Sequence, residues 1–194
     1  MIYAMRHGVT QKNNPDNERV RGWGNDPLDE EGIEQAEAAV KHLKPLNIEV
    51  VFSSDLPRSE QTGEILAEGL GVSNYPIEEL RTWNVGQFQG KLWKRVENDM
   101  AHYQENPYKN VPRGEPYHAF YKRFHDAFQE LRKLKQNVLL VLHGREVWAL
   151  PSVLTNGAKG IPMHGPPNPG DIMAIQDNGN MRYVYRSDYS EQAS

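Results

Sequence analysis

Short apolar runs alternate with helix-length amphipathic stretches along most of this chain, and this alternation constrains its fold more than any other feature. Apolar runs lie near residues 2–5, 50–54 and 137–142, and amphipathic stretches at about 29–43 and 58–70 separate them. Strand–helix alternation is typical of a parallel sheet with helices on both faces. The sequence therefore predicts an α/β fold, a three-layer αβα sandwich with a mainly parallel central sheet.

Local signals set the expected element boundaries. Asp29 can N-cap the first helix, Pro57 can open the second, and Gly71 can end it. Residues 75–77 predict a short edge strand, because an internal proline is tolerated only at a sheet margin. Two further helices are expected within 91–135, then a helix near 146–155 and strands near 171–176 and 181–185. The tail after Asp188 is expected to fray.

Three of the apolar runs are followed by side chains that suit an anionic ligand. The run at 2–5 is followed by Arg6-His7-Gly8, and the run at 137–142 is followed by His143-Gly144. After the run at 50–54, Arg58 falls in the first turn of the next expected helix. Ligands of open α/β sheets bind beyond the carboxyl ends of the strands. There an arginine fork can bind an anion and a neutral imidazole can attack. The sequence predicts that these residues share one site.

Composition excludes several classes of protein. A length of 194 residues favours one domain spanning 1–194, and a net charge of −4 gives no cationic field for nucleic acid. Mean hydropathy is −0.76, and no apolar segment approaches membrane-spanning length. The absence of cysteine and of a secretory-type start fits a cytoplasmic protein. The histidines lack metal-ligand spacing, so no metal site is expected.

Five short motifs occur in order over nearly the whole chain: Arg6-His7-Gly8-Val9-Thr10 with Asn13; Arg21-Gly22-Trp23 with Asp26-Pro27-Leu28, Glu31-Gly32 and Gln35-Ala36; Ser53-Ser54-Asp55-Leu56-Pro57-Arg58 with Gln61-Thr62; Leu80-Arg81 with Gly86 and Gly90; and His143-Gly144. Together they resemble the motifs of the histidine phosphatase superfamily, in its phosphoglycerate-mutase-like branch. The resemblance implies the fold of that branch and the hydrolysis of phosphate esters without a metal or other cofactor.

The resemblance also implies roles for individual residues. His7 would become a transient phosphohistidine, which water then hydrolyses, and Arg6, Arg58 and His143 would hold the phosphoryl group. Asn13 and Gly144 would contribute to phosphate binding. The expected partner is a small phosphorylated metabolite more than a protein, with no nucleic acid and no membrane, and a homodimer is left open.

The sequence departs from the family pattern at the proton donor. The family usually carries a glutamate after Leu-Arg, where this chain has Thr82, and a hydroxyl is too weak an acid to replace it. Glu115, Glu146 and Asp26 are the candidate general acids. Alternatively, the substrate has a leaving group that needs no protonation. General acid catalysis is worth about 10² to 10⁴ in rate, so the departure matters.

Other positions are expected to shape substrate preference. Arg145 follows His143-Gly144 and either extends the pocket toward a second anionic group or is a solvated charge at a helix start. Thr82 and Glu115 are included among the candidate substrate-binding residues. A specificity or lid segment is expected at about 91–121, where aromatic residues are interspersed with cations. About half of these aromatic residues are expected to belong to the core. The loop at 156–170 is expected at the same rim, with His164 as a surface side chain.

Three functions are compatible with the sequence. A metal-independent phosphatase acting through His7 is the leading hypothesis. A phosphoglycerate-type mutase, which would transfer the phosphoryl group again, is disfavoured by the short chain and the missing acid. A pseudoenzyme that binds a phosphorylated ligand would explain Thr82 as a mark of lost catalysis.

Overall fold

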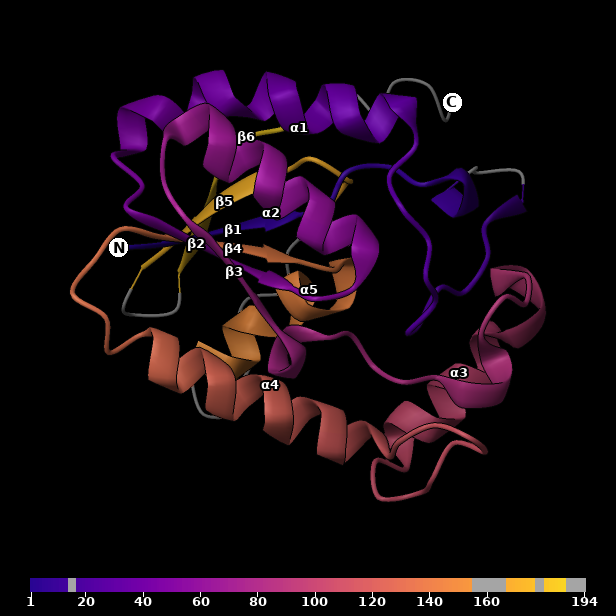
Figure 1. Ribbon diagram of the computed structural model, residues 1–194. Coiled ribbons are helices and arrows are strands. Elements are labelled where there is room, and N and C mark those ends of the chain that lie inside the picture. Colours follow the sequence, from indigo (N-terminus) through magenta and orange to yellow (C-terminus); the bar gives the residue numbers. More distant parts are fainter. Residues whose placement is uncertain (14–16, 155–166, 177–179, 188–194) are drawn as a thin grey trace.

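The protein is described by a computed structural model that covers residues 1–13, 17–154, 167–176 and 180–187 (Figure 1). The strands are β1 (Ile2–Arg6), β2 (Val50–Ser54), β3 (Asn74–Ile77), β4 (Val138–Leu142), β5 (Ile172–Ile175) and β6 (Met181–Tyr185). The helices are α1 (Glu30–Leu43), α2 (Pro57–Leu70), α3 (Trp93–Glu105), α4 (Tyr117–Leu131) and α5 (Gly144–Leu154), with short 3₁₀ turns at Gln11–Asn13, Lys44–Leu46, Glu78–Leu80 and Gly86–Phe88.

The strands form one six-stranded sheet in the order β3-β2-β4-β1-β5-β6. The four strands β3, β2, β4 and β1 are parallel, whereas β5 runs antiparallel to β1 and β6 runs antiparallel to β5. The proline-containing strand β3 lies at one edge, as its sequence predicts. The predicted α/β class with a mainly parallel sheet is therefore confirmed.

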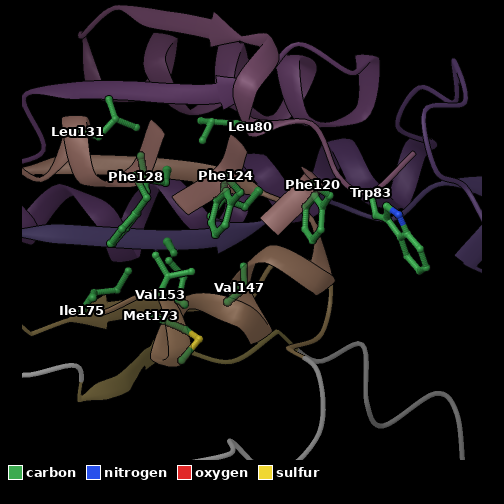
Figure 2. Packing of buried hydrophobic residues seen from close by; sticks show 14 of the residues in the cluster. Leu80, Trp83, Phe120, Phe124, Phe128, Leu131, Val147, Val153, Met173 and Ile175 are labelled. Atoms are coloured by element: carbon green, nitrogen blue, oxygen red, sulfur yellow. The ribbon is translucent and has the colours of Figure 1, made fainter. Parts of the chain in front are cut away.

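Helices cover both faces of the sheet, α1 and α2 on one and α4 and α5 on the other (Figure 1). Each face of the sheet carries its own hydrophobic core, and alternate residues of a strand point to opposite cores. In β4, Leu139 and Val141 pack in the core with α1 and α2, whereas Leu140 and Leu142 pack in the core with α4 and α5. Figure 2 shows Phe120, Phe124 and Phe128 of α4 in a row within that cluster, with Trp83 at one end.

The predicted helix signals act as expected. The Asp29 side chain accepts a hydrogen bond of 2.9 Å from the Gly32 N–H at the start of α1. Pro57 lies in the first turn of α2, and Gly71 ends that helix with a φ of +71°. Helix α5 begins at Gly144, two residues earlier than predicted, so that Glu146 lies within its first turn.

Two predictions from the sequence concern residues beyond this description. Most of the expected rim loop, including His164, lies outside the described residues, and so does the tail from Asp188. Among the helices that the structure describes, none has the length and apolar character needed to cross a membrane.

Candidate active site

Sheet topology places the two motif histidines side by side. His7 directly follows β1 and His143 directly follows β4, and these strands are parallel neighbours with Arg6 opposite Leu142. The His7 N–H continues this ladder with a hydrogen bond of 2.9 Å to the Leu142 carbonyl. The two imidazole rings meet edge to face with their centroids 5.1 Å apart. Both rings are buried at the carboxyl edge of the sheet.

Arg58 reaches the same place from α2, which follows the next strand, β2. Its side chain is 1% exposed, and its guanidinium donates hydrogen bonds of 2.9 Å to the Gly22 carbonyl and 3.1 Å to the Gly24 carbonyl. The loop that carries Gly22 and Gly24 thus orients this cation. An arginine fork held in this way is pre-organised for an anion.

Arg6 is anchored on the opposite side by the chain before β5. Its Nη1 atom donates a hydrogen bond of 2.6 Å to the Pro167 carbonyl. Gly144 lies against the same guanidinium, because a Cβ added there would come within 3.3 Å of it. A glycine at the start of α5 therefore leaves room for Arg6 beside His143.

All four strand-end residues line one cavity of about 620 Å³. These four residues form a polar end together with Arg21 of the loop and Gly144, the first residue of α5. An outer end combines aromatic and amide side chains, among them Trp83, Trp93, Trp148, Asn98 and Gln104. The cavity thus joins a cationic pocket to a larger, mixed surface.

The His7 ring is oriented for attack through one particular nitrogen. Its Nδ1 lies 2.7 Å from the Gly8 carbonyl oxygen, which can only accept a hydrogen bond. Nδ1 therefore carries the proton, and Nε2 keeps its lone pair. Burial lowers the pKa of His7 well below its usual value, and the nearby Arg58, His143, Arg6 and Arg21 add to the effect. The ring is neutral at pH 7, as a nucleophile must be.

The charges at the cationic end suit an anionic ligand. Burial lowers the pKa of Arg58 to about 9, with a further decrease from the Arg21 charge, so Arg58 stays protonated at pH 7. The pKa of His143 is also well below its usual value, first because of burial and then because of Arg58. An anion at this place would relieve the repulsion among these groups.

Arg21 is the site residue that sequence reasoning missed. It lines the cavity beside His7 and Arg58, and its charge lowers the pKa of both. The Arg21-Gly22-Trp23 motif was the available signal, but its spacing from any strand end gave no reason to place its arginine at the site. The loop packs against Arg58 through the Gly22 carbonyl, and this packing brings Arg21 to the site.

Three of the predicted residues lie outside the described lining of this cavity. The Asn13 carboxamide oxygen accepts from the N–H and the hydroxyl of Thr10, and so stabilises the turn after β1. The Glu115 carboxylate pairs with Arg123 at 2.9 Å and accepts from the Asn84 N–H. The Asp26 carboxylate pairs with Lys12 at 2.5 Å.

The remaining predicted residues lie at the junction between the two ends of the cavity. Thr82 lines it, with its backbone carbonyl accepting a hydrogen bond of 2.6 Å from the Trp23 indole. Arg145 also lines it and lies over the Trp83 ring, 5.2 Å from the ring centre. Glu146 is fully buried behind them, and burial raises its pKa.

The predicted specificity segment contributes only its first part to the cavity. Residues of α3 line the outer end, including Trp93, Glu97 and Asn98. The phenylalanines of α4, including Phe120, do not line the cavity and are buried in the core. Tyr108 is 78% exposed and lies against His118, away from this cavity.

The chain belongs to the histidine phosphatase superfamily, branch 1, whose family model matches residues 2–169. It is 28% identical over 170 residues to the probable phosphoglycerate mutase GpmB of Yersinia pestis (strain Pestoides F), an alignment that covers 84% of this chain and 76% of that protein. The resemblance predicted from the five motifs is therefore confirmed.

Solved structures show the same fold. The mycobacterial glucosyl-3-phosphoglycerate phosphatase in complex with VO3 is 25% identical, with a TM-score of 0.73 and coverage of 89% of this chain and 90% of that one. The α-ribazole phosphatase of Shigella flexneri is 23% identical, with a TM-score of 0.71 and coverage of 94% and 93%, a likeness that concerns the fold alone.

Proposed function

We propose that residues 1–194 form one histidine phosphatase domain that hydrolyses phosphate monoesters through a phosphohistidine on His7. The observation that carries this proposal is the His7 ring itself, neutral, with Nδ1 bound to the Gly8 carbonyl and Nε2 left for attack among Arg6, Arg21 and Arg58. A phosphate monoester carries about two negative charges near neutral pH. Its transfer depends mainly on positioning and charge stabilisation.

In this mechanism the reaction has two steps. His7 Nε2 attacks phosphorus while the bond to the leaving oxygen breaks, which gives phosphohistidine and the free alcohol. Water then attacks the phosphorus and releases inorganic phosphate. The charges of Arg6, Arg58 and Arg21 stabilise the equatorial oxygens in both steps, and the neutral His143 donates a hydrogen bond to one of them.

The outer end of the cavity favours a small substrate over a protein. A volume of about 620 Å³ suits a metabolite-sized ligand, and the lining combines tryptophans with amide and carboxylate side chains of α3. The Trp93 and Trp148 rings suit an apolar or ring face of the organic group, and Asn98 and Gln104 can bind its hydroxyls. We propose that the substrate is a small phosphorylated metabolite with such a group.

Two reactions have to be distinguished, because one similar protein is called a probable phosphoglycerate mutase and another a phosphatase. Both reactions pass through the same phosphohistidine. They differ in whether water or a second hydroxyl accepts the phosphoryl group. We favour water, since the outer end opens to solvent around the half-exposed Trp148.

The test is a panel of phosphorylated metabolites together with p-nitrophenyl phosphate, assayed for inorganic phosphate and for phosphorylated products. The proposal predicts stoichiometric inorganic phosphate from at least one metabolite and loss of this activity in His7→Ala. Phosphate transfer to a second metabolite without release would favour a mutase. Tight binding without turnover of any ester would favour a pseudoenzyme.

A further inference from the structure

The proton donor for the leaving group is the part of this chemistry that the family motif does not supply. Thr82 occupies the position where the family usually carries a glutamate, and it lines the cavity between the cationic end and the outer end. The segment around it is fixed, because Arg81 forms two hydrogen bonds of 2.6 and 2.7 Å with Asp55 and Trp23 binds the Thr82 carbonyl. These contacts hold the main chain at Thr82 in place, at the sequence position where the family carries its carboxyl.

A carboxyl group lies directly behind Thr82. Glu146 is in the first turn of α5, three residues after His143, and its side chain is completely buried. Neither carboxyl oxygen has a hydrogen-bond partner of standard geometry among the described residues, although Thr82 lies close enough to act on its pKa. A buried carboxyl whose hydrogen bonds are incomplete costs free energy, which argues for a function beyond packing.

The surroundings keep this carboxyl protonated to a higher pH than usual. Burial raises the pKa of Glu146, and this effect outweighs the opposing effects of Thr82, of the α5 backbone and of the Arg145 and Arg123 charges. Arg58 faces the same carboxyl from α2. A carboxyl that retains its proton to a higher pH than usual is better suited to act as an acid.

We infer that Glu146 and Thr82 together form a proton relay that protonates the leaving oxygen. This inference rests on the proposed phosphatase function and deepens it. Thr82 touches the leaving oxygen, whereas Glu146 does not line the cavity and acts through Thr82. Glu146 is thus a positioning and proton-supplying residue, and it replaces in effect the glutamate that the family carries at position 82.

The relay balances over one turnover. As the bond from phosphorus to oxygen breaks, the Thr82 hydroxyl proton moves to the leaving oxygen and the Glu146 carboxyl proton moves to Thr82 Oγ1. The alcohol leaves, and Glu146 is then a carboxylate. When water attacks the phosphohistidine, its proton returns through Thr82 to Glu146, so the sum of the two steps is ester plus water giving alcohol plus phosphate.

The test compares two substrates that differ in their need for an acid. An alkyl phosphate such as glycerol phosphate has a poor leaving group, whereas p-nitrophenyl phosphate needs scarcely any protonation. Glu146→Gln and Thr82→Val each keep the side-chain shape and remove the acid or the hydroxyl. For both variants, kcat/KM should fall by about 10² or more on the alkyl phosphate and by less than about threefold on p-nitrophenyl phosphate.

Two further variants distinguish a relay from two independent effects. The double variant should lose about as much activity on the alkyl phosphate as either single variant, because groups that act as one unit are not additive. Thr82→Ser keeps a hydroxyl and should restore most of the alkyl phosphate activity. Glu30→Gln removes an exposed carboxylate from the first turn of another helix and serves as the matched control.

The pH dependence of kcat/KM for the unmodified protein, compared between the two substrates, gives a second test, and the Glu146→Gln variant extends it. With the alkyl phosphate, kcat/KM should fall on the alkaline side as Glu146 loses its proton above the usual carboxyl range. This alkaline limb should be absent with p-nitrophenyl phosphate and absent in Glu146→Gln. A profile of the same shape for both substrates would overturn the relay.

The outcomes separate this inference from the proposed function. If p-nitrophenyl phosphate turns over through His7 but Glu146→Gln loses equally on both substrates, or on neither, the relay is wrong and the phosphatase function stands. A selective loss on the alkyl phosphate in Glu115→Gln, with none in Glu146→Gln, would assign the acid to Glu115. If no ester turns over and no phosphohistidine forms, the proposed function itself fails.

Discussion

The two ends of the cavity are held in place by different kinds of interaction. At the cationic end, main-chain carbonyls fix the functional groups: Pro167 binds Arg6, Gly22 and Gly24 bind Arg58, and Gly8 binds His7. At the outer end, side chains hold one another, as where Arg145 lies over Trp83. The family motifs lie mostly at the first end.

This difference predicts how each end responds to substitution of the residues around it. Main-chain carbonyls are present whatever the side chains, so the orientation of Arg6, His7 and Arg58 depends on strand order and on loop conformation. The outer end depends on particular side chains of α3 and α5, so substitutions there should alter it directly. Thr82 lies at the boundary, and there the chain departs from the family pattern.

Arg58→Lys tests the cationic end, and we expect it to lower kcat/KM more than the other substitutions considered below. Lysine keeps the charge but loses the planar fork that binds two carbonyls and an anion. We expect kcat/KM to fall by about 10² or more, and equally for alkyl and p-nitrophenyl phosphates, since both carry the same phosphoryl group. A loss on the alkyl phosphate alone would assign Arg58 to the leaving group and break the division into two ends.

Gly144→Ala sharpens the claim that Arg6 depends on a glycine. The added Cβ would come within 3.3 Å of the guanidinium, which must then move by a few tenths of an ångström. We expect a fall of about tenfold in kcat/KM on both substrates, because small displacements of positioning groups are costly. Circular dichroism should show an unchanged fold, and wild-type activity in this variant would count against the placement of Arg6.

Arg145→Ala tests the outer end at its junction with the cationic end, where Arg145 lies over Trp83. Its loss removes a cation from the lining and from the Trp83 ring, and we expect about a threefold rise in KM for substrates with a bulky organic group. Phosphate itself should inhibit as strongly as before. Arg95→Ala, an exposed arginine of α3 that does not line the cavity, is the matched control and should change neither value.

The two buried histidines predict that the free energy of unfolding depends on pH. His7 and His143 have lowered pKa values in the folded protein, so below about pH 6.5 the unfolded chain binds more protons than the folded one. The free energy of unfolding should therefore decrease as pH falls below that value, by about 1.4 kcal/mol for each pH unit and each histidine that stays neutral. Urea unfolding at pH 5, 6 and 7 measures this slope, and a flat response would contradict the burial of neutral rings.

The sequence predicted the cationic end far better than the outer end, for a physical reason. Strand periodicity and parallel topology determine where the residues after β1, β4 and β2 meet, so His7, His143 and Arg58 could be placed together from local patterns. Arg21 reaches the site through loop packing, which no periodicity encodes. The burial of Glu146 behind Thr82 depends on where α5 begins, and the pairing of Glu115 with Arg123 depends on contacts between distant segments.

Amphipathic periodicity also could not distinguish the two helices of the 91–131 region. Both α3 and α4 have an apolar face, yet α4 buries its phenylalanines against the sheet whereas α3 places Trp93 along the cavity. The difference lies in what each face meets, and that is a property of the whole fold.

The most direct test of the central claim is the identity of the phosphorylated residue. The protein is mixed with p-nitrophenyl phosphate, quenched in alkali within milliseconds to preserve phosphohistidine, and digested for mass spectrometry. The account predicts a phosphoryl group on His7, absent in His7→Ala, which should also lose turnover. A phosphoryl group on another residue, or undiminished turnover in His7→Ala, would contradict the account.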